Sequence, residues 1–496
     1  MSRHDVRWRA DHDKGVLLAN FARRGWTRAA DDSDWNLYWA SPQGTKAIFS
    51  AESGIRLNDN QVVSHFPNHY ELTRKDLMVK NIKRYRKELE RTMLDRQEAN
   101  TPAAAGSSGG GGLCGGVCGG GGSSSAAAQP VPDLDIIPTT FILPNDFSLF
   151  VEEYKKSPSL MWIMKPTSKS QGKGIFLINK LAQVKKWANS RAAQMVGRDA
   201  YVISRYINDP LLIGGKKFDL RIYVLVTSYR PLKVFVYRHG FARFTTVNYS
   251  NEAHDIDNDL MHLTNVAIQK HSDGYSLTHG GKWSMRNLRL YVEGTRGVDA
   301  ANKLLADIGW TIVHSLKSCQ NAMINDRHCF ECYGYDIMID SQLKPWLLEV
   351  NASPSLSTTT PTDRALKMAL IGEVLDIVLP PSFFETGGAS LARAASAVPT
   401  SRDASGNASG RRRSTADAPP AAPSDGASAE DGMAKSMYGE DRSAGGGFEL
   451  LYDEAVELDA EKARRDAAGS STGRGKQPPG RLGSAGARHS GMSHWT

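Results

Sequence analysis

Residues 334–351, GYDIMIDSQLKPWLLEVN, contain two apolar runs that read as neighbouring strands joined by a short turn. Asp336 lies in the first run, and Glu349 and Asn351 lie two residues apart in the second. Side chains two residues apart project from the same face of a strand, so a hairpin would set Asp336 opposite this pair. Two carboxylates and an amide oxygen are hard ligands that suit Mg²⁺ bridging nucleotide phosphates. We favour this metal site over a structural role, because neighbouring carboxylates among apolar residues need a cation.

A glycine-containing loop lies upstream, in KSQGKGIFLI (169–178). Gly172 and Gly174 flank Lys173 there, and glycines let backbone N–H groups approach a phosphate. This pattern also fits an ordinary hairpin. Lys165, however, lies inside the apolar run WIMKP (162–166), and a buried ammonium needs an anionic partner. Together the two features predict a phosphate-binding site.

A third cluster of charged residues lies in GGKKFDLRIYVLV (214–226). Lys217, Asp219 and Arg221 alternate there, so they share one face of a strand. Arg243 follows on a later strand, and HLTN (262–265) adds small polar side chains. Cations on a sheet that also holds carboxylates suggest binding of anionic reactants.

Strand-like runs separated both by turns and by helices predict a mixed α/β fold. The expected strands are 162–165, 174–178, 200–207, 219–228, 233–244, 334–340 and 344–351, and the expected helices are 181–190, 287–294, 302–321 and 363–379.

The chain is expected to divide into six regions: an N-terminal α/β module (1–72), a basic helix (73–96), a flexible Gly/Ser/Ala-rich insert (97–132), a phosphate-loop domain (133–210), a metal-site domain (211–380) and a disordered low-complexity tail (381–496) with a short island at 448–465. We interpret the basic helix mainly as a solvated face. The island is expected to be a short helix, either docking on a partner or without function.

The 496 residues carry a net charge of +8. The tail after residue 380 holds 14 Lys and Arg against 15 Asp and Glu, so the excess of base lies in residues 1–380. This favours an acidic partner, with a basic surface that only aids solubility as the alternative. There is no apolar run long enough for a membrane span, no apolar leader segment and only five Cys. We therefore expect a reducing, intracellular compartment.

Together these segments resemble the tubulin–tyrosine ligase-like family, which has the ATP-grasp fold. The similar segments cover about residues 10–96 and 133–380 and include WIMKP, QGKGIFLI, YVISRYI, GGKKFDLRIYVLV, HLTN, GYDIMID and LLEVNASPSL. Within the family, HGGKW and CFECYGYDI are most similar to polyglutamylases, whereas the insert departs from the family pattern.

The resemblance implies ATP and Mg²⁺ as cofactors and assigns roles to individual residues. The metal ligands would be Asp336, Glu349 and Asn351. The catalytic residues would be Lys217, Asp219, Arg221 and Glu349. Carboxylates of the amino acid or the acceptor would be bound by Arg221, Arg243, Lys282 and Lys367. The nucleotide would be held by Lys165, Gln171, Gly172, Lys173, Gly174, Ser204, Arg205, Tyr206, Ile207, Lys217, Phe218, Asp219, Thr264 and Asn265.

The implied activity is ATP-dependent ligation of free L-glutamate to γ-carboxylates in acidic tubulin tails, through an acyl phosphate. The tail after residue 380 is not cationic, so we expect a catalytic subunit that depends on other polyglutamylase subunits to reach microtubules. The resemblance suggests the cytoplasm and cytoskeleton, at a cilium, flagellum or basal body. The alternatives are a tubulin glycine or tyrosine ligase, or a non-catalytic microtubule or ciliary scaffold. Neither a membrane nor nucleic acid is expected as a partner, since no nucleic-acid motif is present.

Overall fold

The computed structural model describes residues 6–30, 34–100, 134–189, 200–252, 254–276, 278, 280–380, 383 and 446–471. Most of the expected insert (97–132) and most of the expected tail (381–496) lie outside these residues. The chain up to Asp453 forms one structural unit. The chain from Glu454 belongs to a second unit, of which helix α16 (Glu454–Ser471) is described. None of the described helices combines the length with the apolar composition needed to cross a membrane.

The N-terminal module is built on a small sheet in which all neighbouring strands are parallel. Its strand order is β2 (Thr27–Arg28), β1 (Arg7–Ala10), β3 (Leu37–Trp39) and β4 (Val62–Val63). Helices α1 (Gly15–Arg24) and α2 (Pro42–Ile48) follow β1 and β3. Val16, Leu17 and Phe21 recur at helical spacing on α1 and share an apolar cluster with helix α12 (Pro361–Val378). The chain then passes through α3 (Tyr70–Thr73) into α4 (Lys75–Asn100).

A four-stranded antiparallel sheet comes next in the chain. Its strand order is β5 (Thr140–Leu143), β8 (Tyr201–Arg205), β6 (Trp162–Pro166) and β7 (Phe176–Ile178). Helices α5 (Phe147–Lys156) and α6 (Leu181–Ala188) pack on the face that carries Trp162 and Met164. Because side chains alternate along a strand, Ile163 and Lys165 of β6 project from the opposite face, where they line a cleft.

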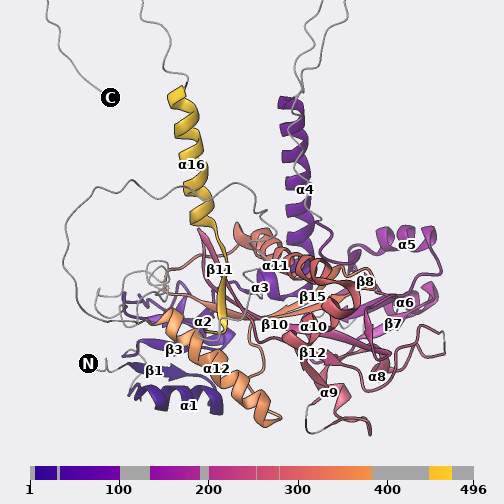
Figure 1. Ribbon diagram of the computed structural model, residues 1–496, viewed down its shortest axis with the longest axis horizontal. Helices are drawn as coiled ribbons and strands as arrows, with labels where there is room; N and C mark the ends of the chain where they lie inside the picture. Colours follow the sequence, from indigo (N-terminus) through magenta and orange to yellow (C-terminus); the bar gives the residue numbers. More distant parts are fainter. Residues whose placement is uncertain are drawn as a thin grey trace, which may run out of the picture. The chain divides into compact units, whose positions relative to one another are not determined.

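An eight-stranded sheet forms the centre of the unit, and all its strand pairs are antiparallel. The order of its main strands is β13 (Lys282–Ser284), β12 (Phe241–Phe244), β10 (Lys216–Tyr229), β11 (Leu232–Tyr237) and β16 (Phe448–Asp453). Strand β10 also pairs with β9 (Leu212–Ile213) and with β14 (Glu331–Ile339). Strand β14 in turn pairs with β15 (Pro345–Asn351). Figure 1 shows the N-terminal module on one side of this sheet and the four-stranded sheet on the other. The remaining helices are α8 (Asp259–His262), α9 (Val266–Gln269), α10 (Met285–Arg296) and α11 (Val298–Gln320).

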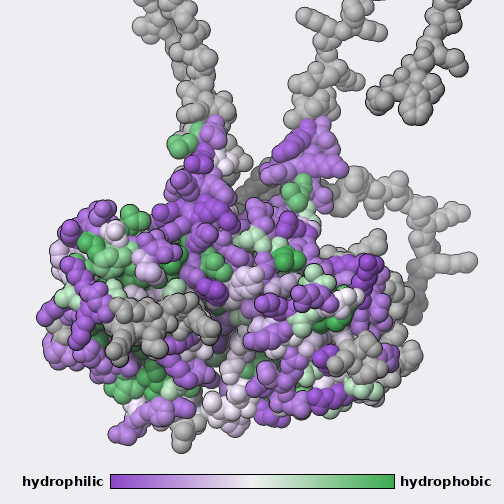
Figure 2. Space-filling view, turned by 180° about the vertical axis from the view of Figure 1, so that it is seen from behind, coloured by the Kyte–Doolittle hydropathy of each residue, from purple (hydrophilic) through white to green (hydrophobic). Residues whose placement is uncertain are grey.

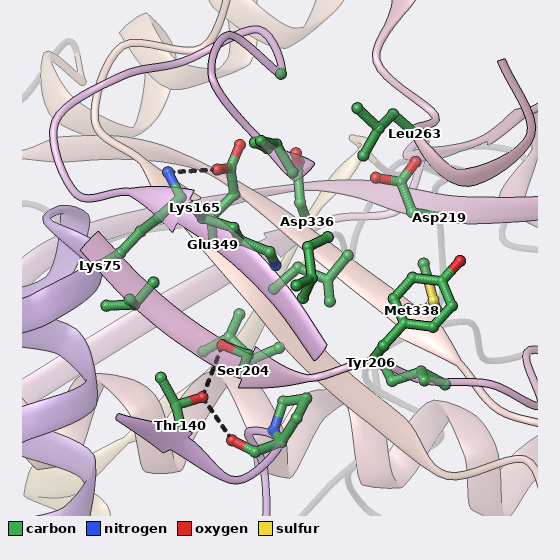
Figure 3. A pocket seen from close by; sticks show the side chains of 18 of the residues that line it. Lys75, Thr140, Lys165, Ser204, Tyr206, Asp219, Leu263, Asp336, Met338 and Glu349 are labelled. Carbon is green, nitrogen blue, oxygen red and sulfur yellow. Dashed lines mark hydrogen bonds and ion pairs between the residues drawn. The ribbon is translucent and has the colours of Figure 1, made fainter. Parts of the chain in front are cut away.

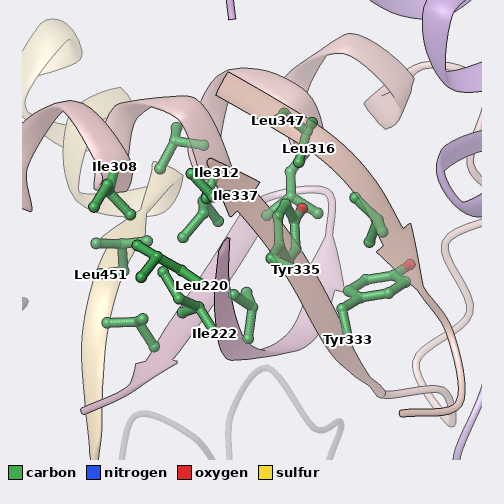
Figure 4. Packing of buried hydrophobic residues seen from close by; sticks show 14 of the residues in the cluster. Leu220, Ile222, Ile308, Ile312, Leu316, Tyr333, Tyr335, Ile337, Leu347 and Leu451 are labelled. Atoms are coloured by element: carbon green, nitrogen blue, oxygen red, sulfur yellow. The ribbon is translucent and has the colours of Figure 1, made fainter. Parts of the chain in front are cut away.

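The largest apolar core lies between this sheet and α11. Leu220 and Ile222 of β10 pack there with Ile312 and Leu316, which are four residues apart on α11 (Figure 4). The period-two alternation of β10 directs Asp219 to the opposite side of the sheet from Leu220. One strand therefore supplies the core on one face and charged residues on the other.

The mixed α/β class expected from the sequence is confirmed, and all the expected helices within 162–379 are present. One expected strand, 233–244, is divided into β11 and β12. The division falls beside Gly240, where an added Cβ would lie 2.7 Å from the carbonyl oxygen of Arg221, so only glycine fits against β10. Strand β5 and helix α5 were not expected. The region boundaries stay a prediction.

The expected helix at 448–465 is wrong in its first part, because Phe448–Asp453 is the edge strand β16. Its residues pair with β11 from Lys233↔Asp453 to Tyr237↔Phe448. Leu451 is buried in the main core, and Lys233 Nζ lies 2.9 Å from the Asp453 carboxylate. The edge of β11 gives the segment backbone partners that its own sequence does not reveal.

We predict that Leu451→Asp lowers the free energy of unfolding by about 3 kcal/mol or more, because it buries a carboxylate among apolar residues. Leu450, which is 45% exposed, is the matched control, and Leu450→Asp should cost less than about 1 kcal/mol. Chemical denaturation measures both, and hydrogen exchange at β11 amides should accelerate in the first variant. Equal small effects would contradict the placement of β16.

Candidate active site

A cleft lies between the inner faces of the four-stranded and eight-stranded sheets. It encloses about 1040 Å³, including its open mouth. Figure 3 shows Lys75, Asp219, Asp336 and Glu349 around this space, although they come from α4, β10, β14 and β15. The same cleft has apolar walls, formed by Ile163, Val202, Leu263 and Met338. It therefore suits a ligand with one apolar part and one highly charged part.

Four charged side chains on neighbouring strands form a buried network beside the cleft. Asp336 accepts hydrogen bonds from Arg221 Nε (2.6 Å) and Nη2 (3.1 Å) and from Arg243 Nη2 (2.7 Å). Arg243 Nε also donates to Asp219 at 2.8 Å. Burial disfavours the charged carboxylate, but Arg221 and then Arg243 outweigh it and hold the pKa of Asp336 below its usual range. The network therefore stays ionised.

Two lysines on facing sheets have weakened basicity. Lys217 is 2% exposed, and its Nζ donates to Tyr206 Oη at 2.7 Å and to the His262 carbonyl at 3.1 Å. Burial, together with repulsion from Lys165, lowers the pKa of Lys217 to about 7. Burial, opposed by Glu349, lowers the pKa of Lys165 to about 8. An anion bound beside them would restore their full charge.

The loop predicted to approach phosphates has a glycine-dependent backbone. Gly172 has a φ of 78° and Gly174 a φ of 75°, both in the left-handed region. A Cβ on Gly172 would lie 2.6 Å from Ile268 Cδ1 and 3.2 Å from Asn265 Oδ1. The loop is thus packed against the segment after HLTN, and Lys173 of the loop lines the cleft with Asn265.

Lys75 is a site residue that the sequence analysis missed. It is the first residue of α4, is 8% exposed, and its Nζ lies 2.8 Å from Glu349 Oε2. The basic helix was interpreted as a solvated face, which is wrong for this residue. The only sequence signal was its position at the N-terminal end of the helix, where a bend at Arg74 separates α3 from α4.

A second charged group joins two further residues predicted to bind substrate. Lys282 Nζ lies 3.2 Å from Asp363 Oδ1, and Lys367 Nζ lies 3.1 Å from Asp363 Oδ2. Lys367 also donates to the Ser357 carbonyl oxygen. Asp363 is buried, and the two lysines outweigh that burial and lower its pKa. Lys282 and Lys367, 85 positions apart in the chain, therefore meet at one carboxylate.

Most residues predicted to hold the nucleotide line the one cleft. They are Lys165, Gly172, Lys173, Ser204, Arg205, Tyr206, Ile207, Lys217, Asp219, Thr264 and Asn265. Gln171 and Gly174 belong to the phosphate loop but are not among the lining residues. The Phe218 side chain packs in the core, with its ring centroid 5.1 Å from that of Phe244. It faces away from the cleft because it alternates with Lys217 and Asp219 on β10.

The predicted metal ligands are brought together in part. Asp336 and Glu349 oppose each other in the β14–β15 ladder and both line the cleft. Asn351 ends β15, with its Nδ2 3.4 Å from Glu349 Oε1. The described residues contain no group of three or more His, Cys, Asp or Glu placed to hold a metal ion. Two carboxylates and an amide would fill only part of the coordination sphere of Mg²⁺. Phosphate and water oxygens commonly fill its remaining positions in proteins.

The two antiparallel sheets with a charged cleft between them fit the ATP-grasp fold. A family model described as "Tubulin-tyrosine ligase family" matches residues 54–386. The chain belongs to this family, and the resemblance inferred from its motifs is confirmed.

Several relatives are similar over most of the described chain. The chain is 53% identical over 386 residues to "Probable alpha-tubulin polyglutamylase Ttll1" of Tetrahymena thermophila, covering 77% of this chain and 87% of that relative. It is 39% identical to "Probable tubulin polyglutamylase TTLL9" of Rattus norvegicus, covering 72% of this chain and 76% of that relative. It is 35% identical to "Tubulin polyglutamylase TTLL5" of Homo sapiens, covering 70% of this chain and 24% of that relative.

We predict that Lys217→Met flattens the dependence of stability on pH. The folded protein releases the Lys217 proton near pH 7, whereas the unfolded chain keeps it until about pH 10.5. The unfolded state therefore binds more protons in this window, and the free energy of unfolding rises with pH across it. The variant should lose up to about 1.4 kcal/mol per pH unit of that slope.

Chemical denaturation at pH 7, 8, 9 and 10 measures the slope. Lys46→Met, at an exposed position on α2, is the control and should retain the wild-type slope. A slope that Lys217→Met leaves unchanged would show that the ammonium is solvated in the folded state.

Proposed function

We propose that the chain is an ATP-dependent tubulin polyglutamylase, which ligates free L-glutamate to γ-carboxylates in acidic tubulin tails. The observation that carries the proposal is the convergence of Lys165, Lys217, Asp336 and Glu349 on one cleft. The relatives named as tubulin polyglutamylases, with identities of 35% to 53%, support tubulin as the acceptor. We further propose that the chain acts as the catalytic subunit of a complex.

ATP fits the donors of the cleft. Ile163, Val202 and Leu263 offer apolar walls to a base, next to the backbone of Ser204–Ile207. Lys165 has no hydrogen-bond or ion-pair partner within the described part of the chain, and its partly buried ammonium would be stabilised by an anion in the cleft. Lys165, Lys173 and Lys217 would therefore hold the phosphates.

Mg²⁺ would be held by Asp336, Glu349 and Asn351, with phosphate oxygens completing the set. Lys75 balances the charge of Glu349 in this structure. A divalent cation held by Glu349 would free the Lys75 ammonium, on its flexible side chain, to bind a phosphate oxygen. Arg221 and Arg243 keep Asp336 ionised and in position.

When bound, Mg·ATP would supply the γ-phosphoryl group that converts an acceptor γ-carboxylate to an acyl phosphate, leaving ADP. The amino group of free glutamate would then attack the carbonyl carbon, expel phosphate and lose a proton, which leaves an isopeptide bond. Lys165 and Lys217 would neutralise charge as it develops on the transferring group. Their lowered pKa values allow them to take up protons as that charge arrives. Asp219 holds Arg243 in place at 2.8 Å.

The incoming glutamate would bind at the second charged group. Lys282 and Lys367 share Asp363 and so present a net positive charge to a carboxylate. Asp363 in turn would keep the two ammonium groups apart and oriented. Arg221 and Arg243, which both donate to Asp336, would bind a second carboxylate.

An acidic, solvated tail is the partner that the surface favours. The face in Figure 2 is mostly hydrophilic, with hydrophobic groups in small separate areas. Residues 1–380 hold the excess of base, whereas the region after 380 carries 14 basic and 15 acidic residues. Other subunits of a polyglutamylase complex would therefore bind the microtubule. The complex would act in the cytoplasm at the cytoskeleton, in a cilium, flagellum or basal body.

The deciding experiment offers Mg·ATP, microtubules and labelled glutamate, glycine or tyrosine in parallel to the purified chain, alone and as a co-expressed complex. Glutamate incorporation by the complex is expected. Glycine or tyrosine incorporation would change the substrate but keep the ligase. Binding to microtubules without any incorporation would support a scaffold instead.

We predict that Glu349→Gln reduces glutamate incorporation at least a hundredfold while the thermal midpoint stays near the wild-type value, because a metal-ligand charge is lost at a cleft wall. Glu88→Gln, on the exposed part of α4, is the control. Normal turnover in Glu349→Gln would refute the metal assignment.

A further inference from the structure

A second cavity lies between the N-terminal module and the loop 352–357 that follows β15. It encloses about 1050 Å³, including its mouth. We call it the serine-loop cavity, because Ser353, Ser355 and Ser357 of that loop line it. Lys14 and His12 face it from the N-terminal module, together with Ser41, Ser64 and His65.

Beside its apolar side chains, the described lining of the serine-loop cavity contains one lysine, two imidazoles and several hydroxyls but no carboxylate. The two carboxylates that flank His12 in the sequence are engaged elsewhere. Asp11 accepts hydrogen bonds from Tyr38 Oη (2.6 Å) and the Ser41 N–H (2.7 Å), and Asp13 lies 3.2 Å from Arg28. The exposed Lys14 ammonium has no ion-pair partner within the described residues. Its charge is therefore available to an anion in the cavity.

A buried pair fixes the imidazole in the cavity wall. His65 Nδ1 lies 2.5 Å from Glu331 Oε1, and the other Glu331 oxygen accepts from the Phe66 N–H at 3.0 Å. Glu331 is fully buried, so its charge is satisfied inside the protein and not in the cavity. This pairing leaves His65 Nε2 for the cavity side, where Ser353 Oγ lies 3.3 Å away.

The loop connects this cavity with the reaction site. It begins directly after Asn351, and its far end is held by Lys367, which donates to the Ser357 carbonyl, and by Asp363, which accepts from the Thr359 N–H at 3.1 Å. The wall of the cavity is therefore the segment that links the proposed metal ligands with the proposed glutamate-binding helix α12.

We propose that the serine-loop cavity binds a carboxylate of the acidic acceptor peptide, next to the glutamate being modified. This inference rests on the proposed function. An extended peptide advances about 3.3 Å per residue and directs alternate side chains to the same side. A run of acidic residues can therefore place one carboxylate at the reaction site while another accepts hydrogen bonds from Lys14 and the serine hydroxyls.

The test uses the full-length chain and a fluorescein-labelled octaglutamate peptide, whose binding is followed by fluorescence anisotropy without ATP. Lys14→Glu should weaken binding about tenfold, and Ser353→Ala about threefold. Lys46→Glu makes the same charge change on the same module but outside the cavity, and should weaken binding less than twofold. Lys14→Glu should raise the KM for the peptide by a similar factor and leave the KM values for ATP and glutamate unchanged.

Equal effects of Lys14→Glu and Lys46→Glu would overturn the proposal, because the peptide would then sense only the overall charge. A change in the KM for ATP or glutamate would also overturn it, since the loop would then only support the reaction site. Selective loss of peptide binding in Lys14→Glu, together with no glutamate transfer by the wild-type chain in its co-expressed complex, would support the cavity and reject the proposed ligase activity.

Discussion

The buried ion-pair network of Asp219, Asp336, Arg221 and Arg243 is the constraint on which the rest of the site depends. It ties β10, β12 and β14 together through side chains as well as backbone ladders. Removing one partner would leave an uncompensated buried charge, which costs about 3–5 kcal/mol. The two carboxylates therefore enter the cleft in fixed positions, with their charge balanced before any ligand arrives.

The alternation of β10 lets one strand build both the core and the site. Leu220 and Ile222 pack against α11, and this packing fixes the height and direction of Asp219 and Arg221 on the other face. The edge strand β16 adds Leu451 to the same core, so a segment more than 60 residues beyond α12 supports the sheet that carries the site. Stability and catalysis are coupled through this sheet.

The sequence predicted what short-range patterns encode. Period-two alternation identified β10, β14 and β15, and an ammonium inside an apolar run identified Lys165. It did not predict Lys75, because a lysine at a helix start usually meets solvent and only the bend at Arg74 directs it to Glu349. It did not predict β16 either, because a strand formed by edge pairing depends on a distant neighbour. The Phe218 side chain was grouped with Lys217 and Asp219 by motif, although alternation directs it into the core.

Transfer of oxygen from the acceptor carboxylate to phosphate would reveal the proposed acyl phosphate. The complex would receive an acceptor peptide with ¹⁸O in its γ-carboxylates, unlabelled Mg·ATP and free glutamate, and mass spectrometry would follow the released phosphate. One ¹⁸O in the phosphate is expected for each glutamate ligated, because the acyl phosphate is cleaved at the carbonyl carbon. Glutamate ligation with unlabelled phosphate would contradict it.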